Sequence, residues 1–212
     1  METQWRYKKY FKNQSGVKER MKNFKNTFLI ILFFLPFNLA GQIKYEREYD
    51  LEKEKVPQLA SAFINRCCPN NKVKWYGEEG LTGKTIEAKI NYGGSLYSIE
   101  FDTAGRMQDV EKKIGLYDIY QDTRLVIVKK LDSIFTKSKI DKIQVQWIGS
   151  NEALCELIEK NNSLLPHIIN YEIVVKGRKG KSSKMYELLF SMHGSILSVL
   201  EITQRNTDNL DY

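Results

Sequence analysis

The sequence predicts an α+β fold, built from two tandem modules that each pack a helix on a four-stranded antiparallel sheet. Three observations predict it: apolar residues at helical spacing open each half, alternating apolar and polar residues follow, and the two halves repeat one another. A strict two-residue alternation is typical of an antiparallel sheet that has helices on one side and water on the other. We therefore expect a first module at 42–114 and a second at 115–212.

The repeat emerges when the chain is compared with itself. A shift of 72 residues aligns five identical pairs: Val56/Val128, Leu59/Leu131, Phe63/Phe135, Val73/Val145 and Trp75/Trp147. A shift of 89 residues aligns four more: Tyr97/Tyr186, Phe101/Phe190, Gly105/Gly194 and Val110/Val199. The second offset is 17 residues larger, which predicts an insertion in the second module at about 149–165.

The first module begins with an amphipathic helix that carries Val56, Leu59 and Phe63 on one face. Pro57 suits the first turn of that helix, where a missing N–H costs nothing. Four strands follow, separated by turns rich in Gly, Asn and Asp, at about 72–76, 86–92, 97–101 and 106–112.

The second module repeats this order of elements. Its helix covers about 128–135, and the insertion holds a helix-like stretch at 151–160. Its strands are expected at about 143–147, 169–175, 186–190 and 196–202.

Residues 1–41 have the pattern of an upstream extension followed by a signal peptide. Two lysines precede an apolar run at 27–37, which is shorter than the ~20 residues of a membrane-spanning helix. The pattern starts directly after Met21, so translation is expected to begin there. Gln42 stands where a lipoprotein needs cysteine. The prediction is a periplasmic or secreted protein, cleaved near this residue and without stable membrane insertion afterwards.

The charge distribution argues against a nucleic-acid partner. The whole chain has a formal net charge of +7, but residues 1–41 contribute eight basic and two acidic side chains. The remaining residues keep 25 basic and 24 acidic side chains. The mature protein therefore lacks the basic surface that binding to phosphates requires.

Cysteine and histidine spacing predicts no metal centre. In an oxidising compartment a disulfide can join Cys155 to Cys67 or to Cys68. A bridge between the adjacent Cys67 and Cys68 would close a strained ring. Three reduced cysteines are an alternative of at least equal weight. His167 and His193 stand at no ligand spacing from these cysteines. We expect no metal, no cofactor and no catalytic residues.

Four motifs of the first module resemble a known family. They are Val-Pro at 56–57, Lys-Trp at 74–75, Glu-Ala-Lys at 87–89, and Tyr-Ser-Ile-Glu-Phe-Asp at 97–102, followed by Gly105. Residues 45–113 thereby resemble the PepSY-like, beta-lactamase-inhibitor-protein-like domain of bacterial envelope proteins.

The second half resembles the family more loosely. It keeps Trp147, Tyr186, Phe190 and Gly194, but it lacks the Val-Pro pair. The resemblance implies an exported, non-enzymatic domain, sometimes in tandem, whose sheet face docks onto another protein in the namesake inhibitor. It does not imply inhibition of a beta-lactamase, because fold does not fix function.

The polar side of the expected sheets supplies the candidate binding residues. Trp75 and Trp147 stand at the alternating strand positions that carry the apolar residues, so both are expected in the core. We call the alternation of positions along a strand its parity. The residues at the opposite positions are expected to be exposed, and they either contact a partner or are simply solvated. They are Lys74, Tyr76, Glu87, Lys89, Asn91, Ser98, Glu100, Gln144, Gln146 and Glu172.

Together these patterns favour an exported, non-catalytic binding or inhibitor-like domain. Its partner is expected to be an envelope protein or peptide, held on the polar sheet face or between the modules; the oligomeric state stays open. One alternative is an envelope enzyme whose carboxylates meet in a cleft with raised pKa values: Glu78, Glu79, Glu100 and Asp102. The other is a membrane-tethered sensor that retains residues 1–40.

Overall fold

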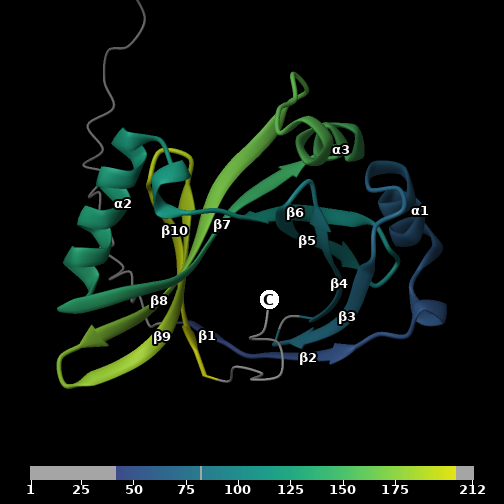
Figure 1. Cartoon of the computed structure of the whole chain (residues 1–212). Helices are drawn as coiled ribbons and strands as arrows, with labels where there is room; N and C mark the ends of the chain where they lie inside the picture. The colour runs from purple at the N-terminus through teal and green to yellow at the C-terminus, as the bar shows by residue number, and fades with distance from the viewer. Residues whose placement is uncertain (1–41, 82, 204–212) are drawn as a thin grey trace, which may run out of the picture. The chain divides into compact units, whose positions relative to one another are not determined.

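The computed structural model describes residues 42–81 and 83–203, which belong to one compact unit (Figure 1). The predicted signal peptide lies outside these residues. The elements follow in this order: β1 (Gln42–Lys44), β2 (Glu46–Asp50), η1 (Lys53–Lys55), α1 (Gln58–Cys67), β3 (Val73–Gly80), β4 (Gly83–Tyr92), β5 (Ser95–Asp102), β6 (Met107–Lys113), η2 (Leu116–Asp118), α2 (Gln121–Ile134), β7 (Lys137–Gly149), α3 (Asn151–Lys160), β8 (His167–Lys179), β9 (Ser182–Ser191) and β10 (Ile196–Ile202).

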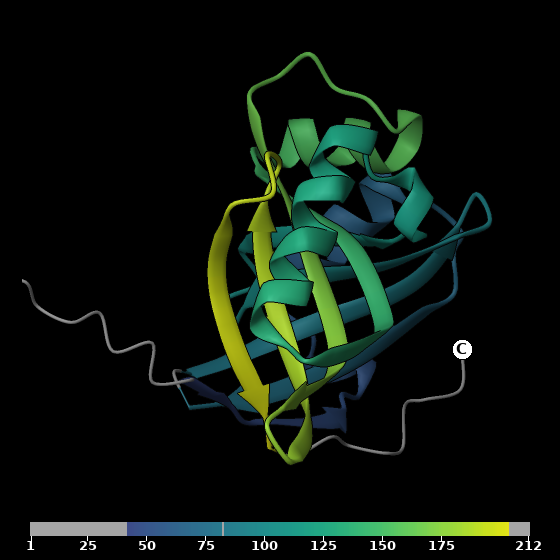
Figure 2. The same ribbon diagram turned by 90° about the vertical axis from the view of Figure 1, so that its left-hand side faces the viewer.

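The described strands form a single ten-stranded sheet in the order β1-β10-β9-β8-β7-β6-β5-β4-β3-β2. β1 pairs with β10 in parallel, and the other neighbouring pairs are antiparallel. Tyr45 alone separates β1 from β2, so two consecutive strands form the two edges of the sheet. The sheet therefore curves into a nearly closed, barrel-like ring, and Figure 2 shows α2 packed on the outside of that curve.

The prediction of two tandem modules, each with a helix on its own four-stranded sheet, is wrong. β6 pairs with β7, from Val110 opposite Trp147 to Lys113 opposite Gln144, and this pairing joins the halves into one sheet. Alternation assigns each side chain to a face, but it does not determine which strands are neighbours. Two separate four-stranded sheets would also leave four edges of unpaired backbone groups, whereas the shared sheet removes two of them.

The apolar core lies between the sheet and the helices outside the ring (Figure 1). Phe63 of α1 packs edge-on against Phe101, with ring centroids 6.0 Å apart, and Phe135 packs against Tyr186 at 4.9 Å. Trp147 is buried in this core, and Trp75 packs against it. The core position of both tryptophans, predicted from their parity, is confirmed.

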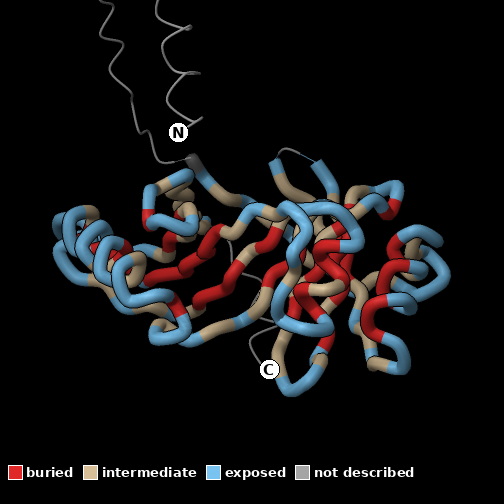
Figure 3. Tube along the Cα trace, turned by 90° about the horizontal axis from the view of Figure 1, so that it is seen from above, coloured by how far each residue is buried: buried red, intermediate tan, exposed pale blue. Residues whose placement is uncertain are grey.

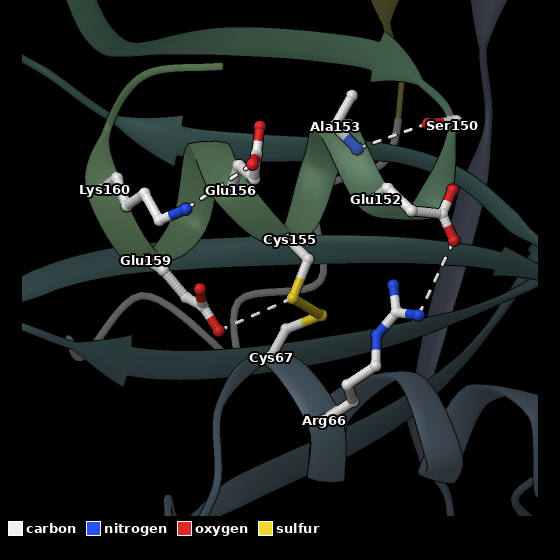
Figure 4. The surroundings of a disulfide bond; sticks show 9 residues. All are labelled: Arg66, Cys67, Ser150, Glu152, Ala153, Cys155, Glu156, Glu159 and Lys160. Atoms are coloured by element: carbon white, nitrogen blue, oxygen red, sulfur yellow. Dashed lines mark hydrogen bonds and ion pairs between the residues drawn. A yellow bond between two sulfur atoms is a disulfide. The ribbon is translucent and has the colours of Figure 1, made fainter. Parts of the chain in front are cut away.

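A disulfide joins α1 to α3 through Cys67 and Cys155, whose Cα atoms lie 5.1 Å apart (Figure 4). Ser150 caps α3 by accepting a hydrogen bond from the Ala153 backbone N–H at 3.2 Å. Cys68 keeps a buried free thiol. The bridge fixes α3 against α1, which ties two parts of the chain that are far apart in sequence.

Candidate binding face

A polar surface of the sheet lies on the side opposite the core. Because the helices lie outside the ring in Figure 1, this surface faces the inner side of the ring. The register aligns its residues across the strands: Glu87 lies opposite Glu100, which lies opposite Asp109. Eight carboxylates from seven strands and three lysines belong to it: Glu48, Glu78, Glu87, Glu100, Asp109, Glu111, Glu172, Glu187, Lys44, Lys89 and Lys142. We call this surface the acidic face.

Much of the acidic face is withdrawn from solvent although its side chains are polar. Glu87 is 5% exposed, Glu111 is 6% exposed and Glu172 is 8% exposed. Figure 3 shows how buried stretches continue along the strands between exposed turns. Because an isolated buried charge is strongly disfavoured, each of these groups needs a cation, a hydrogen-bond donor or a proton.

The lysines neutralise part of the acidic face. The Lys89 ammonium lies 2.9 Å from Glu48 Oε1 and 3.1 Å from Glu87 Oε2. The Lys142 ammonium lies 3.4 Å from Glu172 Oε1. Burial alone would lower the pKa of Lys142, but the carboxylate of Glu172 and then that of Glu111 raise it above the ordinary value. Both lysines are therefore held in their charged form.

The carboxyls outnumber these cations, and their pKa values rise accordingly. Burial, followed by the charges of Glu87 and Glu46, raises the pKa of Glu78 to about 8. Burial, followed by the charge of Glu172, raises the pKa of Asp109 to about 7. Carboxyls with such values are partly protonated at neutral pH, so protons supply some of the missing positive charge.

The same causes act on the neighbouring strands. Burial and the charge of Glu172 raise the pKa of Glu187 to about 7. Burial is also the main reason why the pKa of Glu100 and of Glu111 lies well above the ordinary value. Carboxyls with raised pKa values therefore lie on β3, β5, β6 and β9.

Three buried oxygens of the acidic face accept no hydrogen bond within the described part of the chain: Glu87 Oε2, Asp109 Oδ1 and Gln144 Oε1. Glu87 Oε2 still has its ion pair with Lys89. The Gln144 side chain is 5% exposed, and no ion pair of the described residues offers its Oε1 atom a positive charge. All three atoms are acceptors. The face therefore has more acceptors than donors, which favours a ligand that brings N–H groups.

Glu48, Glu78 and Glu87 each place a carboxylate oxygen within 4.8 Å of the other two, a spacing that suits a metal ion. The Lys89 ammonium already lies beside two of these carboxylates. A metal ion would have to displace this lysine, so the geometry favours the internal ammonium as the cation of this trio.

The ten predicted binding residues all fall on the sheet side that faces away from the core, as their parity predicts. Their expected exposure is wrong for four of them, which are buried: Tyr76, Glu87, Gln144 and Glu172. Lys74 and Asn91 are exposed, and Lys89, Ser98, Glu100 and Gln146 are intermediate. The curvature of the sheet and the closure by β1 and β2 bury this side, and neither follows from an alternating pattern.

The four carboxylates of the predicted enzyme site do not meet in one cluster. Glu78 and Glu100 belong to the acidic face. Glu79 instead pairs with Lys84 at 2.6 Å, and Asp102 binds the Arg106 side chain and backbone at the β5–β6 turn. Lys84 lowers the pKa of Glu79, and the hydrogen bond from the Arg106 backbone N–H lowers the pKa of Asp102.

Sequence reasoning did not select several residues of the acidic face. Asp109 and Glu111 alternate with Val110 on β6, and Glu187 stands between the buried Tyr186 and Leu188. Their parity was readable in the sequence. Lys44 and Glu48 carried no such signal, because the short strands β1 and β2 were not predicted.

No helix in residues 42–81 and 83–203 has the length and apolar character needed to cross a membrane.

No protein-family model matches the chain, and no curated protein matches its sequence significantly. Solved structures that are similar to it include a DUF2874 family protein from Bacteroides ovatus, at 12% identity and a TM-score of 0.48, over 72% of this chain and 92% of that one. A candidate periplasmic protein from Bacteroides eggerthii is similar at 12% identity and a TM-score of 0.48, over 72% and 93%.

A third similar structure is a BLIP-like protein from Bacteroides fragilis, at 16% identity and a TM-score of 0.45, over 72% of this chain and 90% of that one. The predicted PepSY resemblance and the tandem repeat find no counterpart in these comparisons. Identities and TM-scores of this size establish no family; the chain is similar in structure to BLIP-like and DUF2874 proteins of Bacteroides.

Proposed function

We propose that this chain is an exported, non-catalytic binding protein. Its acidic face, together with exposed residues on the same side of the sheet such as Lys74 and Asn91, contacts an envelope protein or peptide. The observation that supports this proposal is the composition of the face: eight carboxylates against three lysines, with buried acceptors that lack donors. Such a surface complements a partner that carries positive charge and N–H groups.

Binding is favoured over catalysis because the carboxylates are spread over seven strands and line neither of two surface cavities. A cavity of about 440 Å³ lies between α1 and the β5–β6 turn, beside Leu59 and Arg106. Another, of about 320 Å³, lies near Trp75. A catalytic carboxyl needs a pocket that holds the substrate against it.

Site-specific photo-crosslinking in the native envelope tests this proposal. A photoreactive residue at Lys74 or Asn91, both exposed on the polar side of the sheet, is expected to capture one specific protein. The matched controls are Leu59 on α1 and Leu125 on α2, each 59% exposed on the helical side. Equal capture from both sides, or none from the polar side, contradicts the proposal.

A second candidate function, acid–base catalysis, is favoured by one observation: the pKa values of Glu78 and Asp109 lie near neutrality. It predicts turnover of an envelope glycan or peptide that disappears in Glu78→Gln but persists in Glu79→Gln. Absence of turnover with intact binding would leave the binding function alone.

Export is tested by the intact mass of protein recovered from the envelope. Cleavage as proposed gives a chain that begins at or near Gln42. A mass that includes residues 21–41 would instead support the membrane-tethered sensor.

A further inference from the structure

The N-terminal segment bridges the two edges that the remaining strands leave open. β1 adds to β10 in parallel, with Gln42 opposite Leu200, and β2 adds to β3 antiparallel, with Asp50 opposite Tyr76. We call residues 42–50 the strap. Without the strap, β3 and β10 would each present an unpaired edge to solvent, which is a template for another extended segment.

The strap carries one cation, Lys44, into the acidic face, together with the carboxylates of Glu46 and Glu48. The Lys44 ammonium lies 2.7 Å from Glu187 Oε2 and 3.1 Å from Glu46 Oε2. Burial alone would lower the pKa of Lys44, but the carboxylates of Glu187, Glu172 and Glu46 outweigh this effect and raise it. A lysine on an added strand is therefore already accommodated by the carboxylates of β8 and β9.

The strap has one further ion pair in the acidic face, between Glu48 and Lys89 at 2.9 Å, and its apolar contacts are partial. β1 has three residues, and the large side chains of the strap remain partly in water: Ile43 is 53% exposed, and Tyr45 and Tyr49 are each 38% exposed. None of these three side chains is fully buried, so backbone hydrogen bonds and ion pairs contribute much of the attachment. Such a segment exchanges with solvent more readily than the strands of the core.

We propose that the strap is an exchangeable occupant of the acidic face, and that the partner's ligand segment is an extended stretch with a lysine or arginine in the place of Lys44. This inference rests on the proposed function and names the chemistry of the partner. Without the strap, the face keeps seven carboxylates against Lys89 and Lys142, and Gln144 Oε1 still lacks a donor. The strap itself has two basic and three acidic side chains, so an extended segment that keeps the basic residue and has fewer acids would supply more positive charge, as well as N–H groups.

Competition between the strap and a peptide of the same sequence tests the inference. The probe is a labelled nine-residue peptide, Gln-Ile-Lys-Tyr-Glu-Arg-Glu-Tyr-Asp, and its matched control has glutamine in place of the lysine. The full mature chain is compared with Lys44→Gln, which loosens the strap, and with Lys44→Arg, which keeps the charge. A third variant, Ile43→Cys/Glu201→Cys, can lock β1 to its Cα partner on β10.

The Lys44→Gln chain is expected to bind the peptide about tenfold more tightly than the wild type, because its binding-competent open state is more populated. Lys44→Arg should bind as the wild type does. The locked chain should not bind, whereas Ile43→Cys alone should bind normally. The glutamine peptide should bind more weakly than the lysine peptide to each chain that binds.

Hydrogen exchange of the β10 amides at 200–202 gives a second measurement. Exchange of these amides should be faster in Lys44→Gln, and saturating peptide should slow it again. Global unfolding would instead also speed exchange of the amides of β5 and β8. Equal peptide affinity for the loosened and locked chains overturns the inference, and so does the absence of binding to all of them.

The photo-crosslinking experiment separates this inference from the proposed function. If the locked chain still captures the envelope partner at Lys74 or Asn91, the binding function stands and the exchange of the strap is wrong. If the peptide binds as expected but no envelope protein is captured, the strap exchanges and the proposed partner is wrong.

Discussion

Gly77 and Gly177 each lie under an aromatic ring. An ideal Cβ on Gly77 would overlap the Tyr49 ring of β2, with the hydroxyl oxygen 2.6 Å away. A Cβ on Gly177 would overlap the ring of Phe135, whose Cζ atom lies 2.9 Å away. Tyr49 is 38% exposed and can move into water, whereas Phe135 is 3% exposed and is enclosed by the core. The same added methyl group should therefore have different consequences at the two sites.

We expect Gly177→Ala to lower the free energy of unfolding by about 1–3 kcal/mol, because overpacking displaces a core ring. Gly77→Ala should cost less than about 1 kcal/mol but should speed hydrogen exchange in β2, since its ring moves off the sheet. Urea denaturation and amide exchange measure the two effects. Equal destabilisation by both alanines would show that Tyr49 is as firmly held as Phe135.

The residues of the candidate site were only partly readable from the sequence. Parity correctly placed Glu87 and Glu172 on the side away from the core, because side chains alternate strictly along a strand. Parity gave no information on their burial, which depends on sheet curvature. Lys44 could not be predicted at all, because its partner Glu187 lies on a strand near the other end of the described chain.

Helices and strands were predicted better than their arrangement. Apolar periodicity located α1, α2 and α3, and alternation located β3 to β10. β2 was missed because its sequence, Glu-Arg-Glu-Tyr-Asp, has charges on both parities and no apolar alternation. The pairing of β6 with β7 was missed as well, since a repeat in sequence says nothing about whether its two copies share a sheet.

The disulfide between α1 and α3 makes a prediction about these helices. Cys67 and Cys155 are 88 residues apart, so the bridge removes much conformational freedom from the unfolded chain. Replacing both by alanine should lower the free energy of unfolding by about 2–5 kcal/mol.

The buried free thiol provides the control for this prediction. Cys68→Ala removes one buried sulfur atom and should cost about 1 kcal/mol. Urea denaturation of oxidised protein measures both changes. A double alanine variant as stable as Cys68→Ala would show that the bridge contributes no stability in solution.

The acidic face makes the stability of the whole molecule depend on pH. Burial, followed by neighbouring carboxylates, raises the pKa of Glu78 to about 8 and those of Asp109 and Glu187 to about 7. The folded state therefore binds more protons than the unfolded state between about pH 4.5 and 8. Each raised carboxyl contributes stability below its unfolded pKa and loses it as pH rises through the folded value.

We expect the urea midpoint to fall as the pH is raised from 5 to 8, with a loss on the order of 1–3 kcal/mol. Glu78→Gln, which stays neutral, should flatten this dependence. The matched control is Glu79→Gln, because the pKa of Glu79 is lowered by Lys84 and this residue titrates below the window. A midpoint that rises over this range would show that the carboxyls are stabilised in their charged form.

The pairing of β1 with β10 also sets an order of events in time. Strands β3 to β10 each pair with the strand that precedes or follows them in sequence, but β1 must meet a strand from the opposite end of the described chain. Contacts between such distant segments form late, because they require the largest loss of chain entropy. A folding molecule thus passes through a period in which β10 is formed and β1 has not arrived. During that period a partner competes with β1 by its rate of arrival rather than by its affinity.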